Sequence, residues 1–67
     1  MNTIQRVRDL AAERELSIYK ISQMSEISYS TFRTAEQRNG ELSVAVIMRV
    51  CAALGITVAE FFSVFTD

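Results

Sequence analysis

Apolar residues recur at helical spacing in the first segment of the chain. The apolar positions of residues 3–15 follow one another at intervals of three, three and one, as one face of a helix requires. They are Ile4, Val7, Leu10 and Ala11. Thr3 is a suitable N-cap for this helix, and Arg6 lies off the apolar face with the other charged residues. The pattern predicts an amphipathic helix over residues 3–15.

Two shorter helices are predicted next, joined by a tight corner. Ser17 and Ser28 are placed to cap helices over residues 18–24 and 29–37, because each offers a hydroxyl to an unpaired backbone N–H. Only three residues separate the first helix from the second cap, which leaves room for a turn alone. The apolar positions expected to close one interior across the corner are Ile21, Met24, Ile27, Phe32 and Ala35. Two helices in this relation form a helix-turn-helix, whose second helix can enter the major groove of DNA.

The last third of the chain predicts two more helices. Ser43 caps a helix over residues 44–54, and Gly55 suits the left-handed position after its end. Its expected buried face consists of Val44, Ile47, Val50, Cys51 and Leu54. Thr57 and Glu60 then form a capping box at the start of a short fifth helix. The core residues expected from this helix are Val58, Phe61 and Phe62. The sequence therefore predicts an all-α, compact five-helix domain, one domain over residues 1–67, with a helix-turn-helix at helices 2 and 3.

Composition leaves little material for catalysis or for a bound metal. The 67 residues include one cysteine and no histidine, so neither an internal disulfide nor a Cys/His metal site is expected. Cys51 lies on an apolar face, and no glycine-rich phosphate loop is present. We expect no enzyme activity, no cofactor and no small-molecule substrate. No apolar run approaches the roughly 20 residues of a membrane span, and the start lacks the apolar centre of a signal peptide. The expected location is therefore the cytoplasm, without membrane contact.

Net charge alone argues against a nucleic-acid partner. The chain carries a formal charge of −1 and has a pI of about 5.3, whereas duplex affinity depends on Lys and Arg neutralising phosphates. The charge is distributed unevenly, and the part of the chain that holds the predicted helix-turn-helix is not acidic. Residues 1–40 hold six of the seven basic groups against five acids. Because one face of the domain decides binding, the whole-chain sum does not exclude DNA.

The order of helices, caps and core positions resembles the lambda-repressor/Cro-like (xenobiotic-response-element type) helix-turn-helix family over about residues 4–62. The matching residues are Leu16-Ser17, Ile21-Ser22, Ile27-Ser28, Ser30-Thr31-Phe32, Glu36, Ser43, Val44, Ile47, Val50, Leu54-Gly55-Ile56, Val58 and Phe61-Phe62. Three positions depart from the family pattern. Ile18 stands where the family commonly has a phosphate-contacting Gln, and Ala11 where a helix-one Arg usually pairs with the acid equivalent to Glu36. Leu42 stands where the loop before the fourth helix usually has a Pro.

The resemblance implies double-stranded DNA as the partner. Ser28 would contact a phosphate at a helix N-terminus. The residues expected to face base edges are Tyr29, Ser30, Arg33 and Thr34. Arg33 is the side chain suited to a guanine, and Tyr29 to a thymine methyl or a phosphate. The residues expected along the DNA backbone are Gln37, Arg38 and Asn39.

These features predict a sequence-specific DNA-binding transcriptional regulator. We expect a phage- or mobile-element-type repressor that acts as a homodimer on a palindromic operator. The apolar residues left over for the dimer contact are Val46, Met48, Val64 and Phe65. The alternative is a protein-interaction module on the same fold, antitoxin-like or anti-repressor-like, with weak or no DNA binding. The acidic pI, Ile18 and Ala11 favour it, and Tyr29 would then simply cover the apolar seam of the corner.

Overall fold

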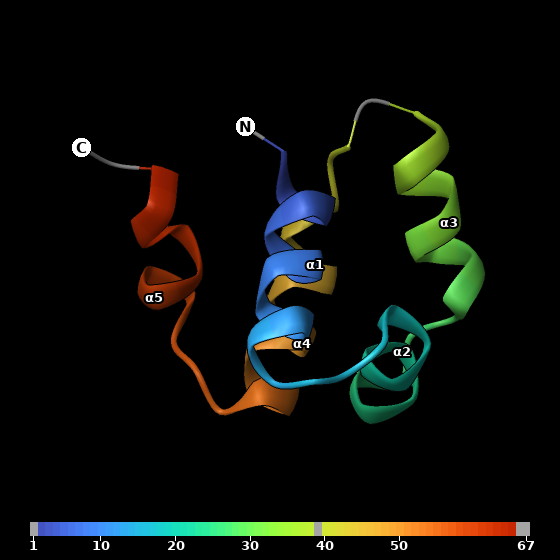
Figure 1. The fold of residues 1–67 in the computed structure, drawn as a ribbon. Coiled ribbons are helices and arrows are strands. Elements are labelled where there is room, and N and C mark those ends of the chain that lie inside the picture. Colours follow the sequence, from blue (N-terminus) through green and yellow to red (C-terminus); the bar gives the residue numbers. More distant parts are fainter. Residues whose placement is uncertain (1, 39, 66–67) are drawn as a thin grey trace.

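The computed structural model describes residues 2–38 and 40–65, and Figure 1 shows these residues as a helical fold. The α-helices are α1 (Thr3–Glu13), α2 (Ile18–Ser25), α3 (Tyr29–Gln37), α4 (Val44–Leu54) and α5 (Val58–Phe62). A 3₁₀ turn, η1 (Ser63–Phe65), follows α5. No strand occurs in the described part of the chain, so the predicted all-α class with five helices is confirmed.

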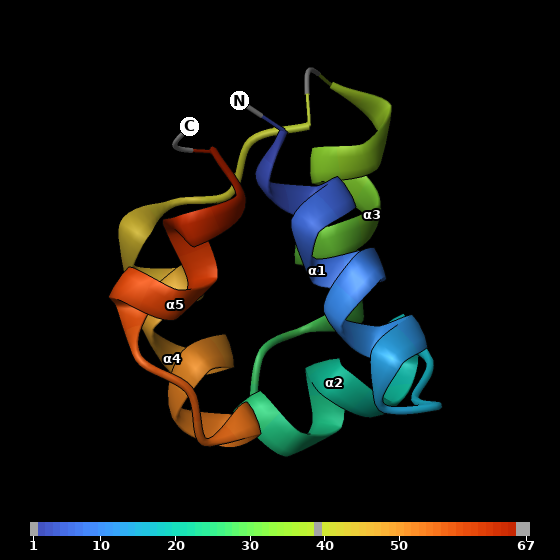
Figure 2. The ribbon, with the colours of Figure 1, turned by 60° about the vertical axis from the view of Figure 1, so that its left-hand side comes forward.

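Helix α1 lies in the middle of the fold, between α5 on one side and α3 on the other, with α4 behind it (Figure 1). Turning the molecule shows α2 below, where it meets α4, α3 and α1 (Figure 2). The largest fully buried side chains come from all five helices: Phe32, Phe61, Ile21, Ile47, Val7, Val50 and Thr3. A single apolar core therefore supports the helix-turn-helix from behind.

Four of the predicted helix starts are confirmed by their capping hydrogen bonds. Ser17, Ser28 and Ser43 each accept a bond from a first-turn backbone N–H through the side-chain oxygen. Both bonds of the Thr57–Glu60 capping box are present, at 3.0 and 3.1 Å. Local sequence decides these boundaries because each cap bonds within three residues of itself.

The first helix begins and ends differently from the prediction. Its N-cap is Asn2, whose Oδ1 accepts from the backbone N–H of Gln5 at 3.0 Å, and not Thr3. Its last residue is Glu13, because Glu15 adopts a left-handed conformation (φ 56°) and reverses the chain. The backbone N–H of Leu16 then bonds back to the carbonyl of Ala11 at 2.8 Å.

Thr3 is buried and holds the loop between α3 and α4. Its hydroxyl donates to the carbonyl of Gly40 at 3.2 Å and accepts from the backbone N–H of Leu42 at 2.6 Å. The backbone N–H of Ile4 donates to the same Gly40 carbonyl at 2.9 Å. The start of α1 therefore fixes the exit of the chain from α3.

Arg6 was expected off the apolar face, but it is buried between α1 and α5. Its Nε donates to the carbonyl of Phe61 at 2.7 Å, and its Nη2 donates to the carbonyl of Glu60 at 3.0 Å. The guanidinium carbon also lies 5.8 Å from the centre of the Phe61 ring. At the end of α5 the Glu60 carbonyl also accepts from the backbone N–H and the hydroxyl of Ser63. Arg6 thus adds a charged donor from α1 to the last carbonyls of α5.

Three residues expected in the core are exposed. Met24 is 40% exposed, Val44 68% and Val58 39%, so those predictions are wrong. Val44 lies on the same side of α4 as the buried Ile47 and Cys51, but it is the first residue of the helix, at its end rather than over the core. In a domain of this size the core is filled before every apolar position is used.

Candidate nucleic-acid interface

Helix α3 separates its side chains into a buried face and an exposed face. Phe32 and Ala35 are buried and pack the helix onto the core. The exposed residues fall within an arc of about 140° on the opposite side, given 3.6 residues per turn. They are Tyr29, Ser30, Arg33, Thr34 and Gln37. The structure thus brings together, on one outward face, the five α3 residues that the sequence proposed as DNA contacts.

The two ends of this face carry the remaining candidates. Ser28 is exposed and caps α3, accepting from the backbone N–H of Ser30 at 3.3 Å, with the two hydroxyl oxygens 2.8 Å apart. Arg38 is exposed just after the last helical residue. Asn39 lies outside the described residues. The N-terminal N–H groups of α3 carry partial positive charge, which suits a phosphate beside Ser28.

An exposed aromatic pair links α2 to the start of α3. The rings of Tyr19 and Tyr29 meet edge to face, with centres 5.5 Å apart and planes at 79°. The guanidinium carbon of Arg33 lies 6.0 Å from the centre of the Tyr29 ring. Tyr19 and its neighbour Lys20, also exposed, were not among the sequence candidates. The apolar pattern of α2 shows only that these residues lie off its buried face. No local sequence signal indicates that Tyr19 contacts Tyr29.

The acid near the end of α3 has a partner after all. Because Ala11 occupies the position where the family usually has a helix-one arginine, Glu36 lacks the customary partner. In the structure Arg8, another residue of α1, forms the ion pair with Glu36 instead. Arg8 sits three residues before Ala11, about one helical turn away, and Ala11 itself is buried. The pair joins α1 to α3 and offsets the negative charge beside the outward face.

The position of Ile18 explains its departure from the family pattern. Its side chain is half-buried and packs against the core. It therefore helps to seat α2, while Tyr19 and Lys20 are the exposed residues of that first turn. In the first turn of α2, only these two side chains are available to a phosphate.

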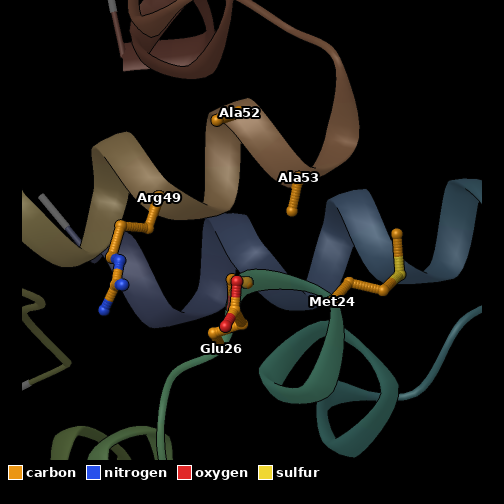
Figure 3. A pocket seen from close by; sticks show the side chains of 6 residues that line it. Met24, Glu26, Arg49, Ala52 and Ala53 are labelled. Carbon is orange, nitrogen blue, oxygen red and sulfur yellow. The ribbon is translucent and has the colours of Figure 1, made fainter.

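Behind the corner lies an open hollow of about 320 Å³. Figure 3 shows Arg49, Ala52 and Ala53 of α4 on one side and Met24 and Glu26 of the corner on the other. Glu26 ends α2 in a left-handed conformation (φ 57°). The hollow is lined by small and flexible side chains and is wide open to solvent, unlike the enclosed clefts that hold small ligands.

Residues 2–38 and 40–65 contain no metal site, no reactive cysteine and no single membrane-spanning helix. No group of three or more His, Cys, Asp or Glu residues in these segments could hold a metal ion. Cys51 is buried, and this burial raises the pKa of its thiol above the ordinary 9.0, so the unreactive protonated form predominates at neutral pH. In the same segments no single helix is long and apolar enough to cross a membrane. Only α4 and Val58–Phe65 taken together reach that length and composition, and they are bent by 109°.

The four residues proposed for a dimer contact differ in exposure. Met48 and Val64 are 56% and 58% exposed. Val46 is half-buried against the core, and Phe65 is half-buried with its ring 6.1 Å from that of Phe62. Contacts within the chain therefore cover part of Val46, which packs on the core, and part of Phe65, which packs on Phe62.

Comparison with known proteins agrees with this arrangement. A family model described as a Cro/C1-type HTH DNA-binding domain matches residues 6–67. No curated protein and no solved structure gave a match. The family match covers almost the whole chain, from within α1 through α5, and it confirms the lambda-repressor/Cro-like resemblance. The chain therefore belongs to the Cro/C1-type helix-turn-helix DNA-binding domain family.

Proposed function

We propose that this protein is a sequence-specific transcriptional regulator that inserts α3 into the major groove of double-stranded DNA. The observation that carries the proposal is the outward face of α3, where Arg33 and four other side chains are exposed while Phe32 and Ala35 anchor the helix. Membership in a family of DNA-binding domains supports it. The role is one of binding, and the proposal includes no catalysis and no cofactor.

The exposed residues are assigned by their chemistry. Arg33 reads a guanine, because a guanidinium matches the paired acceptors of that base, and Ser30 and Thr34 face neighbouring base edges. Ser28 binds a phosphate at the start of α3. Gln37 and Arg38 lie along the DNA backbone, together with Asn39, which lies outside the described residues.

We further propose a repressor of phage or mobile-element type that acts as a homodimer on a palindromic operator. One domain of 67 residues offers a small footprint and few cations. Two-fold symmetry doubles the contacts and reads half-sites about 34 Å apart, one turn of the duplex. Such a regulator works in the compartment that holds the genome, which for a phage repressor is the bacterial cytoplasm.

The dimer contact is proposed on the outer face of α4. Met48 and Val44 lie one turn apart there and are among the most exposed large apolar residues described. Val64 is a second exposed candidate, with Val46 and Phe65 contributing only the part of their surface that the core leaves open. Exposed apolar residues grouped on one helix face are typical of a protein contact.

A protein-interaction module without DNA binding is the second candidate. The same exposed residues of α4 favour it, as does the half-buried Ile18 in place of a phosphate-binding side chain. An apolar protein contact responds weakly to salt, whereas DNA binding releases counterions and weakens steeply. Salt response therefore distinguishes the two functions.

The first experiment is a mobility shift with random duplex DNA at about 50 and 200 mM salt. Lys20 and Arg38, the two exposed cations of the helix-turn-helix that are available to phosphates, predict a slope of log affinity against log salt of about −2 per domain. Absence of any shift at the lower salt concentration would reject DNA binding and favour the interaction module.

Variants of two arginines separate base reading from phosphate binding. Arg33→Ala should lose about 1–3 kcal/mol of discrimination between preferred and random duplexes, with little change in melting temperature. Arg38→Ala is the matched comparison, and it should weaken binding to both duplexes equally. If Arg33→Ala also weakens both equally, Arg33 contacts a phosphate and the assignment of guanine reading is wrong.

A further inference from the structure

Two tyrosine rings and a guanidinium lie together where α2 meets the start of α3. Tyr19 touches Tyr29 edge to face, and Arg33 lies one turn along α3 with its guanidinium 6.0 Å from the centre of the Tyr29 ring. Tyr19 is 56% exposed and Tyr29 37%, and Arg33 is exposed as well. None of the three side chains is buried in the core. This Tyr19–Tyr29–Arg33 cluster is therefore available to a partner on the outward face.

We infer that the cluster reads a thymine next to a guanine, with Tyr19 as a positioning residue that holds the Tyr29 ring in place. The inference rests on the proposed function and specifies the DNA sequence that the domain prefers. It adds a residue of α2 to the interface and names two adjacent bases. Arg33 contacts the guanine, and the face or edge of the Tyr29 ring contacts the methyl group of the thymine.

The chemistry of the major groove supports this pairing of bases. Guanine presents two acceptors to a guanidinium, and thymine presents a methyl group, which an apolar surface recognises. Successive bases of one strand are about 3.4 Å apart along the axis. A distance of 6.0 Å from the Arg33 guanidinium to the ring centre thus places the nearer part of the Tyr29 ring over the neighbouring base.

Tyr19 matters because Tyr29 is the first residue of α3. No preceding helical turn constrains a side chain at that position, so its ring needs another support. The edge-to-face contact from α2 supplies one, and the guanidinium of Arg33 lies over the same ring. Loss of the Tyr19 ring should therefore disturb methyl recognition without removing any atom that touches the bases.

The test begins with duplexes selected from a random pool by the wild-type protein. The selected half-sites should contain a guanine beside a thymine. Replacing that thymine by deoxyuridine removes only the methyl group, and it should weaken wild-type binding about fourfold, the effect of one buried methyl. Tyr29→Ala should bind the two duplexes equally. Tyr19→Ala should lose most of the difference between them, and Tyr19→Phe should keep it, because the ring contact needs no hydroxyl.

Several results would overturn the inference. Selected sites without a thymine beside the guanine would do so, as would an equal deoxyuridine effect in wild type and Tyr29→Ala, which reports DNA shape alone. Equal losses of affinity in Tyr19→Ala and Tyr19→Phe would show that the hydroxyl contacts a phosphate. A Tyr19→Ala protein with a lower melting temperature and an unchanged deoxyuridine effect would show that the residue is only structural.

Failure of the inference can be distinguished from failure of the proposed function. If the wild type prefers its selected duplex but ignores the methyl group, the inference fails and the proposed function stands. If it binds no duplex, both fail.

Discussion

The guanidinium of Arg6 is the clearest case of one residue joining distant parts of this domain. It donates to the carbonyls of Phe61 and Glu60, 55 and 54 residues away in sequence. Hydrogen bonds from a charged group contribute about 1.5–3 kcal/mol each when their partners are buried. The Glu60 carbonyl also accepts from the hydroxyl of Ser63, so it loses less than the Phe61 carbonyl when Arg6 is removed.

Arg6→Met should lower the free energy of unfolding by about 2 kcal/mol, because the methionine fills the space but donates no hydrogen bond. Urea denaturation monitored by circular dichroism measures the change. Arg14→Met is the matched control, since Arg14 is exposed at the end of α1, and it should change stability by no more than about 0.5 kcal/mol. Similar losses in the two variants would show that the Arg6 hydrogen bonds contribute nothing specific.

At the scale of single residues, the sequence predicted local helix caps better than hydrogen bonds between distant parts of the chain. The caps at Ser17, Ser43 and Thr57 were predictable because their hydrogen bonds are local. The burial of Arg6 was not, because its acceptors belong to a helix more than 50 residues away. Both Asn2 and Thr3 have suitable capping side chains, and only the distant Gly40 loop decides between them.

At the scale of elements, the loop between α3 and α4 is held against the start of α1. Gly40 adopts a φ of +83°, and its carbonyl accepts from both Thr3 and Ile4. A Cβ added at Gly40 would lie 2.5 Å from the Oδ1 of Asn2, the atom that caps α1. Any side chain at position 40 would therefore clash with the Asn2 cap, and only glycine avoids this clash.

Gly40→Ala should cost about 2–3 kcal/mol, of which about 1–2 is left-handed strain and about 1 the disturbed cap. Gly55→Ala should cost only the strain, because Gly55 has a φ of +71° but nothing within 4 Å of an added Cβ. Denaturation of the two variants measures the difference. In an Asn2→Ala background the additional cost of Gly40→Ala should fall to the strain alone. An unchanged cost there would exclude the clash with Asn2.

Helix α3 shows which features can be predicted from a single element and which cannot. The bounds of α3 agree with the sequence prediction, and so does the division into buried and exposed residues. The ion pair of Arg8 and Glu36 was missed because the expected arginine position, Ala11, lies one turn further along α1. The Tyr19–Tyr29 contact was missed because helix periodicity orders residues within an element and says nothing about contacts between elements.

At the scale of the whole molecule, the outer face of α4 is predicted to join two copies. Met48→Asp places a charge on that face and should convert a dimer into a monomer at micromolar concentration, with a parallel loss of affinity for a palindromic duplex. Its stability should be nearly unchanged, because Met48 is 56% exposed in the single chain. Sedimentation equilibrium and thermal unfolding measure the two effects.

Ala12→Asp is the matched control for this variant, because it adds the same charge on the exposed side of α1. It should leave the oligomeric state unchanged. A Met48→Asp protein that stays dimeric would place the contact elsewhere, with Val64 as the next candidate to test. A wild-type protein that is monomeric at every concentration examined would reject the homodimer itself.

The buried guanidinium of Arg6 also sets the order in which a newly made chain can fold. The ribosome synthesises this residue early and its acceptor carbonyls 54 and 55 residues later, a delay of about 3–11 s at 5–20 residues per second. Until then the Arg6 guanidinium has only the Glu13 carboxylate of the same helix, with Nη1 and Oε2 4.0 Å apart, and lacks both carbonyl acceptors. The helix-turn-helix is thus complete in sequence well before α1 can make its hydrogen bonds to α5, and these bonds form only once α5 has been synthesised.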